Sequence, residues 1–188
     1  MRKSVKGRVK NMREKTEIMD DRAIARAVAR IAYEVVEKNR GVEDVCVLGI
    51  LTRGACLADR VAQKIAEVEG RMVPVGYLDI APFRDDAKRT PASSDRSQIP
   101  FSVEGKRVLL VDDVIYTGRS IRAAIDAVMM RGRPTNIQLA CLIDRGHREV
   151  PIRADYIGKN LPTSRNEMVR VLVMETDGSD RVVICADE

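Results

Sequence analysis

The segment 108–120 constrains the fold more tightly than any other part of the sequence. It opens with four consecutive apolar residues, and Asp112 and Asp113, the acidic pair, follow them directly. A continuous apolar run is typical of a strand that is buried on both faces of a parallel sheet. Thr117 and Gly118 then make a turn that leads into a helical pattern. The segment therefore predicts a strand, two acids, a turn and a helix in succession, as in an open α/β sheet.

The same strand-to-helix unit recurs along the chain, and its repetition predicts the fold class. Apolar runs of strand length alternate with stretches in which apolar residues recur every three to four positions. This alternation indicates an α/β fold with a parallel central sheet flanked by helices. The predicted helices cover residues 20–40, 55–69 and 120–130, and the predicted strands cover residues 45–50, 72–80, 107–111 and 136–143. Short β-rich runs at residues 154–158, 168–174 and 181–185 predict a sheet extension or small hood.

Length and charge predict one cytoplasmic domain with a basic tail. The chain has 188 residues, of which 45% are hydrophobic, so it can bury one substantial core. It has no apolar run of the length that a membrane span needs and no signal sequence. Residues 1–16 hold seven Lys or Arg and one Glu without apolar periodicity, and we predict a disordered tail there and a single domain over residues 17–188.

Metal-binding and disulfide patterns are missing from the sequence. The four cysteines are far apart, and the chain has one histidine. Neither a zinc site nor a disulfide framework is predicted, and no side chain is assigned to a metal. Residues 17–188 carry 26 basic and 27 acidic side chains, so a polyanionic partner would require clustered charge on one surface.

Residues 81–100 form a long stretch of polar residues, prolines and charges between two predicted strands. Loops of this length inside compact domains are uncommon and are usually functional lids or disordered inserts. We predict a flexible lid or hairpin here in preference to a simple linker.

The turn after the acidic pair has the features of a phosphate site. Backbone N–H groups at the start of the following helix carry partial positive charge. Gly118 permits close backbone approach, Thr117 and Ser120 can donate hydroxyl hydrogen bonds, and Arg119 adds a charge or faces solvent. The acidic pair can then accept hydrogen bonds from a ribose. The alternative is that the acids only end a strand and cap the turn, which is less consistent with two adjacent acids before Thr-Gly-x-Ser.

This segment resembles the motif with which type I phosphoribosyltransferases bind 5-phosphoribosyl-1-pyrophosphate (PRPP). In that family a loop after the first sheet strand contacts pyrophosphate, and residues 51–54 occupy the matching place. Without the resemblance, Thr52-Arg53-Gly54 is only a turn with one cation. The resemblance implies that PRPP or a nucleotide binds to two sets of residues: Thr52 and Arg53, and Asp112, Asp113, Val114, Ile115, Tyr116, Thr117, Gly118, Arg119 and Ser120.

A longer resemblance covers nearly everything outside the basic tail. Asp79-Ile80, Phe83-Arg84-Asp85-Asp86 and the run 142–164 resemble the PyrR family of pyrimidine attenuation regulators. That family implies transfer of ribose 5-phosphate from PRPP to uracil, giving UMP and pyrophosphate, with Mg²⁺ held mainly by substrate oxygens. It implies catalytic roles for Asp112, Asp113, Arg53 and Arg84, and a base-binding hood of Ile143, Asp144, Arg145 and Val169.

The PyrR resemblance also implies a second function. Members bind the leader RNA of pyrimidine genes when UMP is bound and promote transcription termination. The implied RNA contacts are Arg26, Arg30, His147, Arg148, Arg153, Lys159 and Thr163. Spacing alone leaves Arg26 and Arg30 equally consistent with a solvated helix face. Aromatic residues are 3% of the chain, so contact through phosphates and hydrogen bonds is favoured over stacking platforms.

Three hypotheses share the PRPP site: an enzyme that also regulates through RNA, a phosphoribosyltransferase for uracil or another base without an RNA role, and a regulator with vestigial catalysis. The family implies a homodimer or a larger homo-oligomer. Two parts of the sequence depart from the usual family pattern. Ala29 stands where a hydroxyl residue often precedes Arg30, and Ala81-Pro82-Phe83 replaces Thr-Leu-Tyr.

Overall fold

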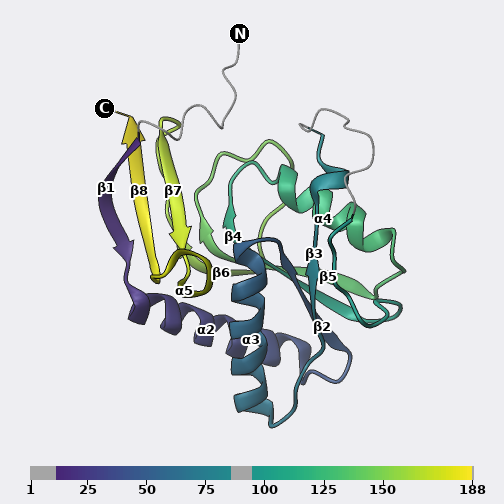
Figure 1. Cartoon of the computed structure of the whole chain (residues 1–188). Coiled ribbons are helices and arrows are strands. Elements are labelled where there is room, and N and C mark those ends of the chain that lie inside the picture. The colour runs from purple at the N-terminus through teal and green to yellow at the C-terminus, as the bar shows by residue number, and fades with distance from the viewer. Residues whose placement is uncertain (1–11, 86–94, 188) are drawn as a thin grey trace.

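The central element is a parallel sheet of five strands, described by a computed structural model that covers residues 12–85 and 95–187. The strands lie in the order β3-β2-β4-β5-β6, and every neighbouring pair is parallel (Figure 1). Their bounds are β2 Val45–Ile50, β3 Val75–Leu78, β4 Arg107–Ile115, β5 Asn136–Asp144 and β6 Tyr156–Asn160. The predicted α/β class with a parallel central sheet is confirmed.

Helices cover both faces of this sheet and create two hydrophobic cores. On one face, α2 (Asp21–Asn39) and α3 (Arg53–Glu69) pack against residues such as Val47 and Leu109. On the other face, α4 (Arg119–Met129) packs against residues such as Leu48 and Leu110. Neighbouring residues of one strand thus belong to different cores, as the period of two in a strand requires. This burial on both sides explains why these strands are continuously apolar.

Local signals set the helix boundaries. The Asp20 side chain accepts a hydrogen bond of 2.7 Å from the Ala23 N–H and caps α2, and Gly70 ends α3 at a φ of 65°. Both features follow the sequence expectation. Helix α3 begins at Arg53, however, two residues before its predicted start, so Arg53 belongs to the first turn of a helix. None of the described helices is long and apolar enough to span a membrane.

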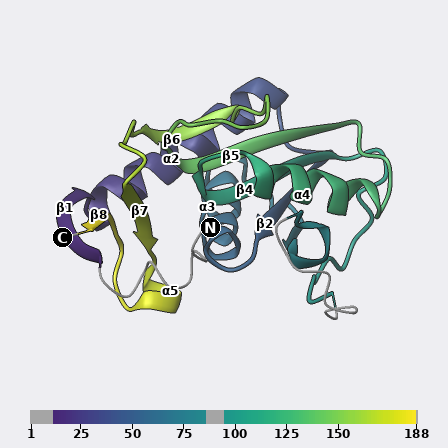
Figure 2. The same cartoon turned by 90° about the horizontal axis from the view of Figure 1, so that it is seen from above.

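A separate antiparallel sheet forms the hood. Its strands are β1 (Met12–Met19), β8 (Arg181–Asp187) and β7 (Glu167–Leu172), in the order β1-β8-β7, with the short α5 (Met174–Asp177) between β7 and β8. Figure 2 shows the hood to one side of the parallel sheet. The predicted tail was wrong at its boundary, because residues 12–16 belong to β1. Residues 13–17 of this edge strand are solvent-exposed and polar or charged, so no apolar alternation reveals it. Residues 1–11 lie outside the described part of the chain.

The long polar stretch after β3 begins with a short 3-10 helix, η2 (Ala81–Phe83). Asp79 links the start of this stretch to the part that follows residue 94. The Asp79 carboxylate accepts hydrogen bonds from the Ala81 N–H at 3.0 Å and from Arg96 Nε at 2.8 Å. Tyr77 and Gln98 then form an antiparallel bridge. The predicted lid spans residues 81–100, of which residues 86–94 lie outside the described part.

Candidate functional site

The acidic pair lies within the last four residues of β4, which continues to Ile115, four residues beyond the predicted strand end, and its two carboxyl groups are tied to the backbone. Asp112 is 8% exposed. Its Oδ1 accepts a hydrogen bond of 2.9 Å from the Asp113 N–H, and Asp113 Oδ1 accepts one of 2.8 Å from the Val114 N–H. Burial raises the pKa of Asp112 well above its ordinary value, and the neighbouring Asp113 raises it further. Burial also raises the pKa of Asp113, against the opposing effect of Arg53.

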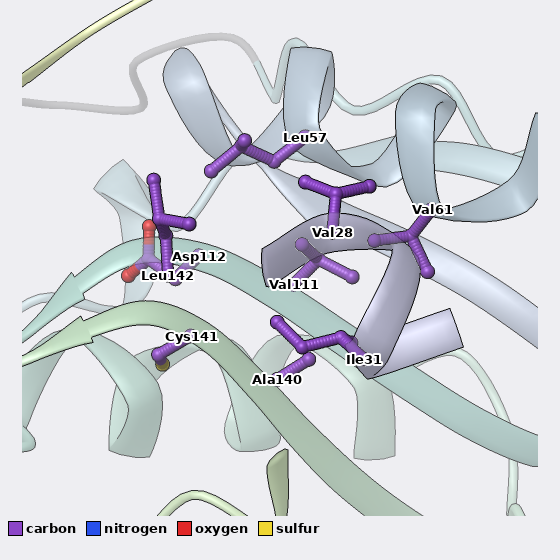
Figure 3. A pocket seen from close by; sticks show the side chains of 9 residues that line it. All are labelled: Val28, Ile31, Leu57, Val61, Val111, Asp112, Ala140, Cys141 and Leu142. Carbon is purple, nitrogen blue, oxygen red and sulfur yellow. The ribbon is translucent and has the colours of Figure 1, made fainter. Parts of the chain in front are cut away.

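The residues behind Asp112 explain the burial. Figure 3 shows a small internal pocket with Asp112 at one end and apolar side chains from α2, α3, β4 and β5 along the rest. Those apolar residues are Val28, Ile31, Leu57, Val61, Val111, Ala140 and Leu142, together with Cys141. Such surroundings disfavour the charged form of a carboxyl group. The acidic pair therefore retains a proton over a wider pH range than two exposed acids would.

The loop from Tyr116 to Gly118 connects the acidic pair to α4 and is shaped to bind an anion. Gly118 has a φ of 86°, and a Cβ there would lie 2.7 Å from Val150 Cγ2. Within the described part of the chain, the N–H groups of residues 116–118 have no hydrogen-bond acceptor. Helix α4 then starts with its free N–H groups directed to the same region. Unpaired backbone donors at a helix start are a ready site for phosphate.

The loop after β2 is pressed against the acidic pair. A Cβ on Gly54 would lie 2.6 Å from the Val111 oxygen and 3.2 Å from Asp112 Cα, so only glycine permits this approach. Thr52 precedes α3 and follows a cis peptide bond with Leu51. Arg53 stands close enough to Asp113 to lower the pKa of that carboxyl group. The two predicted loops, distant in sequence, thus meet at one end of the sheet.

Arg53 already has a partner in the hood. Its Nε and Nη2 donate to Asp177 Oδ2 and Oδ1 at 2.9 Å and 2.7 Å, a bidentate ion pair. Asp177 also accepts hydrogen bonds from the Val173 N–H and the Thr176 hydroxyl. The hydrogen bonds from Arg53 hold the pKa of Asp177 well below its ordinary range. Nη1 of Arg53 makes no hydrogen bond to the described residues and remains available to an anionic ligand.

Charged groups of the lid reach the phosphate loop. Arg84 Nη1 donates to the Ser120 hydroxyl at 3.3 Å, and Arg84 also lowers the pKa of Asp112. The sequence predicted that Arg119 either adds a charge to the phosphate site or faces solvent. In the structure it donates to two carboxylates, Asp85 in the lid at 2.7 Å and Glu149 at 2.6 Å. The lid and the segment after β5 are thereby joined across the loop.

The base-binding candidates divide into core and contact residues. Ile143 is fully buried and Val169 is 8% exposed, so their side chains fill the core and only their backbone can face a ligand. Arg145 lies 3.9 Å from the centre of the Tyr116 ring and donates to the Thr163 hydroxyl and the Glu167 oxygen. Arg145 therefore connects the phosphate loop to the hood.

The RNA candidates lie on α2, on β6 and on the segments that flank β6. Arg30 joins the two groups, since its Nη2 donates to the Ile157 and Gly158 oxygens of β6 at 3.0 Å and 2.6 Å. His147 contacts the Thr163 oxygen at 2.6 Å through Nε2. Arg26, Arg153 and Lys159 are exposed and have no side-chain partner among the described residues.

Sequence reasoning missed one functional candidate, Asp177, which meets Arg53 across 124 positions. A bidentate pair between distant residues leaves no local pattern. Tyr116 was predicted as part of the nucleotide loop, and its ring lies under Arg145. Among the described residues no group of three or more His, Cys, Asp or Glu could hold a metal ion.

An open parallel sheet with two adjacent acids, an amide-lined loop and a helix start at its carboxyl edge is the arrangement of the phosphoribosyltransferase class of proteins. Residues 14–173 match the phosphoribosyl transferase domain family. The hypoxanthine phosphoribosyltransferase of Trypanosoma cruzi has the same fold, with a TM-score of 0.71 at 17% identity over 93% of this chain and 98% of that one.

Closer relatives give the family. The chain is 56% identical to the "Bifunctional protein PyrR" of Pelotomaculum thermopropionicum over 176 residues, which cover 92% of this chain and 96% of that protein. It is 50% identical to the protein of the same name from Clostridioides difficile, over 92% and 99% of the two chains. The chain therefore belongs to the PyrR family of phosphoribosyltransferase-fold proteins.

Proposed function

We propose that this protein transfers ribose 5-phosphate from PRPP to uracil, giving UMP and pyrophosphate, and that its UMP-bound form binds the leader RNA of pyrimidine genes. The observation that carries the enzymatic half is the acidic pair, of which Asp112 is buried and Asp113 half-buried, beside a loop of unpaired amides. This arrangement provides one place for a phosphate and, next to it, carboxylates for a ribose.

The acidic pair acts on the sugar. Breaking the bond between the anomeric carbon and pyrophosphate builds positive charge on the ribose, and preorganised carboxylates stabilise that charge in a site that excludes water. Burial raises the pKa of both acids because a charged carboxyl group is poorly solvated there, so positive charge that develops on the ribose would favour their ionised form. The backbone N–H bonds to Asp112 and Asp113 fix both carboxyl groups before substrate arrives.

The cationic side chains act on the leaving group. Arg53 offers Nη1 to pyrophosphate while Asp177 holds its other edge. Arg84 enters from the lid and already lies within reach of Ser120. Closure of the lid would bring this second cation to the pyrophosphate and exclude water from the reacting carbon.

Magnesium fits this site as a substrate-borne ion. The ion prefers oxygen ligands and usually binds through phosphates and one or two carboxylates. The described residues provide the acidic pair and no larger cluster, so the diphosphate oxygens would supply most of the coordination. Bound there, the ion would neutralise charge on the departing pyrophosphate.

The regulatory half rests on two basic segments that the fold brings together. Arg30 ties α2 to β6, so that the exposed Arg26 and Lys159 belong to neighbouring elements. Tyr116 and Arg145 connect the nucleotide loop to the strand-flanking segment that carries Thr163. This contact is a physical route by which bound UMP can influence the RNA surface.

One preparation tests both halves. The protein is mixed with Mg²⁺, PRPP and labelled uracil or hypoxanthine, and RNA retention on a filter is then measured with and without UMP. We expect UMP as the product and stronger retention with UMP. A purine nucleotide product contradicts the base assignment, and UMP formation without UMP-enhanced retention leaves a transferase with no RNA role.

A further inference from the structure

A hollow of about 570 Å³ lies beside β6, outside both loops of the PRPP site. The side chains that matter for its chemistry are Asp144, Arg148, Arg153, Ile157, Asn160 and Pro162. Its volume is in the range of pockets that take a small ligand. The PyrR resemblance implies a base contact for Asp144 and RNA contacts for Arg148 and Arg153, but none of these roles uses the hollow itself as a binding site.

Arg148 lines the hollow as a fixed plane. Its Nε donates to the Ile152 oxygen at 2.9 Å, its Nη1 to the Tyr116 oxygen at 2.7 Å, and its Nη2 to Asp144 Oδ2 at 2.5 Å. The side chain is 20% exposed. These bonds commit the guanidinium to protein oxygens, so it has little left to donate to a phosphate. An immobile guanidinium plane is, however, a surface on which a nucleobase can stack.

Two other side chains that line the hollow have unpaired hydrogen-bonding groups. Asn160, the last residue of β6, and Arg153 are both exposed, and neither side chain has a hydrogen-bond partner within residues 12–85 and 95–187. A free carboxamide can both donate to and accept from one base edge. A free guanidinium binds phosphate bidentately. Ile157 and Pro162 add apolar wall to the same hollow.

A fixed cationic plane, a free amide, a free guanidinium and apolar walls match one nucleotide with its base inserted and its phosphate at the rim. We propose that the hollow binds an unpaired adenine of RNA, with Asn160 reading the base edge, Arg148 stacking on it and Arg153 holding the adjacent phosphate. The pairing of an Asn carboxamide with the N6 and N7 atoms of adenine is the recognised bidentate contact. This inference rests on the proposed RNA binding and names the part of the RNA that is read.

The surroundings favour a nucleotide within a chain over a free one. Lys159 precedes Asn160 on β6, and Arg30 bonds to the β6 oxygens from α2, where Arg26 also lies. Arg30 is committed to these oxygens and to Glu34, so the exposed Lys159 and Arg26 are the cations that a phosphate backbone leaving the hollow could contact. The phosphate of a free mononucleotide would contact only Arg153 among these cations.

The test uses the full chain with UMP and three RNA hairpins that share one stem and carry loops made only of A, U or C. Filter retention gives each affinity and its dependence on salt. We expect the parent to prefer the A loop by about fivefold to one-hundredfold, the range that one bidentate base contact supplies. Asn160→Ala should abolish this preference without changing the salt slope, whereas Arg153→Ala should weaken all three hairpins alike and lower the slope by about one.

Arg71→Ala is the matched control, because Arg71 is exposed just beyond α3 and has no side-chain partner among the described residues. It should change neither the preference nor the slope. UMP formation by Asn160→Ala should equal that of the parent, which shows that the fold is intact. Retention of the A preference in Asn160→Ala, or its absence from the parent, overturns the adenine site alone.

Two further outcomes distinguish failure of the adenine site from failure of RNA binding as a whole. A parent that retains no hairpin overturns the RNA half of the proposed function and the adenine site with it, while UMP formation reports on the enzymatic half independently. Free AMP is the second probe. In a competition assay, AMP and unlabelled A-loop hairpin are compared as competitors of the labelled A-loop hairpin. Equal potency of the two would assign the hollow to a free mononucleotide and overturn the RNA assignment.

Discussion

Replacing Gly118 by alanine tests the link between backbone conformation and the phosphate site. The residue has a φ of 86°, which an L-residue with a Cβ adopts at a cost of about 1–2 kcal/mol. The new Cβ would also lie 2.7 Å from Val150 Cγ2. Val150 cannot simply rotate away, because a β-branched side chain is stiff and its N–H is bonded to the Thr117 oxygen. Overpacking of this kind adds about 1–3 kcal/mol.

The two effects together predict that Gly118→Ala loses about 2–5 kcal/mol of unfolding free energy. For a chain of this size each kcal/mol lowers Tm by about 2–4 °C, so the expected decrease is roughly 4–20 °C. The displaced loop should also raise the KM for PRPP, about tenfold for each 1.4 kcal/mol of lost binding. Thermal unfolding followed by circular dichroism and an initial-rate assay measure the two effects.

Gly70→Ala separates the two causes. Gly70 has a φ of 65°, but a Cβ on it would meet nothing within 4 Å, and it is remote from the site at the end of α3. It should lose only the conformational contribution of about 1–2 kcal/mol and keep its KM. Adding Val150→Ala to Gly118→Ala should recover part of the stability. Equal losses in Gly118→Ala and Gly70→Ala would refute the role of the Val150 contact, and an unchanged KM would refute the role of the loop in PRPP binding.

Three other predictions follow from the site. Asp113→Asn should reduce turnover by about 100-fold. Burial raises the pKa of this carboxyl in the folded state, so its ionisation opposes folding, and the variant should be more stable than the parent at pH 7. Urea titrations at several pH values should show that this advantage disappears as the pH falls below the pKa of the unfolded chain. Asp177→Asn should raise the KM for PRPP by about fivefold, because Arg53 loses a partly exposed bidentate partner. The control Glu175→Gln weakens the neighbouring ion pair with Arg60 and should leave the KM unchanged. Arg26→Ala should lower the salt slope of RNA retention by about one unit, and an unchanged slope would assign this arginine to solvent.

The sequence by itself determined the features that are local in the chain. Segment 108–120 holds the apolar strand, the acidic pair, the turn and the helix start in contiguous residues, and β4 and α4 followed that order. The N-cap at Asp20 and the glycine stop of α3 were also predictable, because each depends on the dihedral angles and hydrogen bonds of a few neighbouring residues.

The tertiary structure alone decided which distant groups meet. Arg53 and Asp177 are 124 positions apart, and Arg30 reaches the β6 oxygens across 127 and 128 positions. The chain also placed residues 12–16 in an edge strand that no apolar alternation reveals. The PyrR resemblance implied that Arg148 contacts RNA, and only the fold shows that its hydrogen-bond donors are committed to protein oxygens. A guanidinium has the same charge wherever it stands in a sequence, but whether it is free to bind a ligand depends on the oxygens that the fold brings to it.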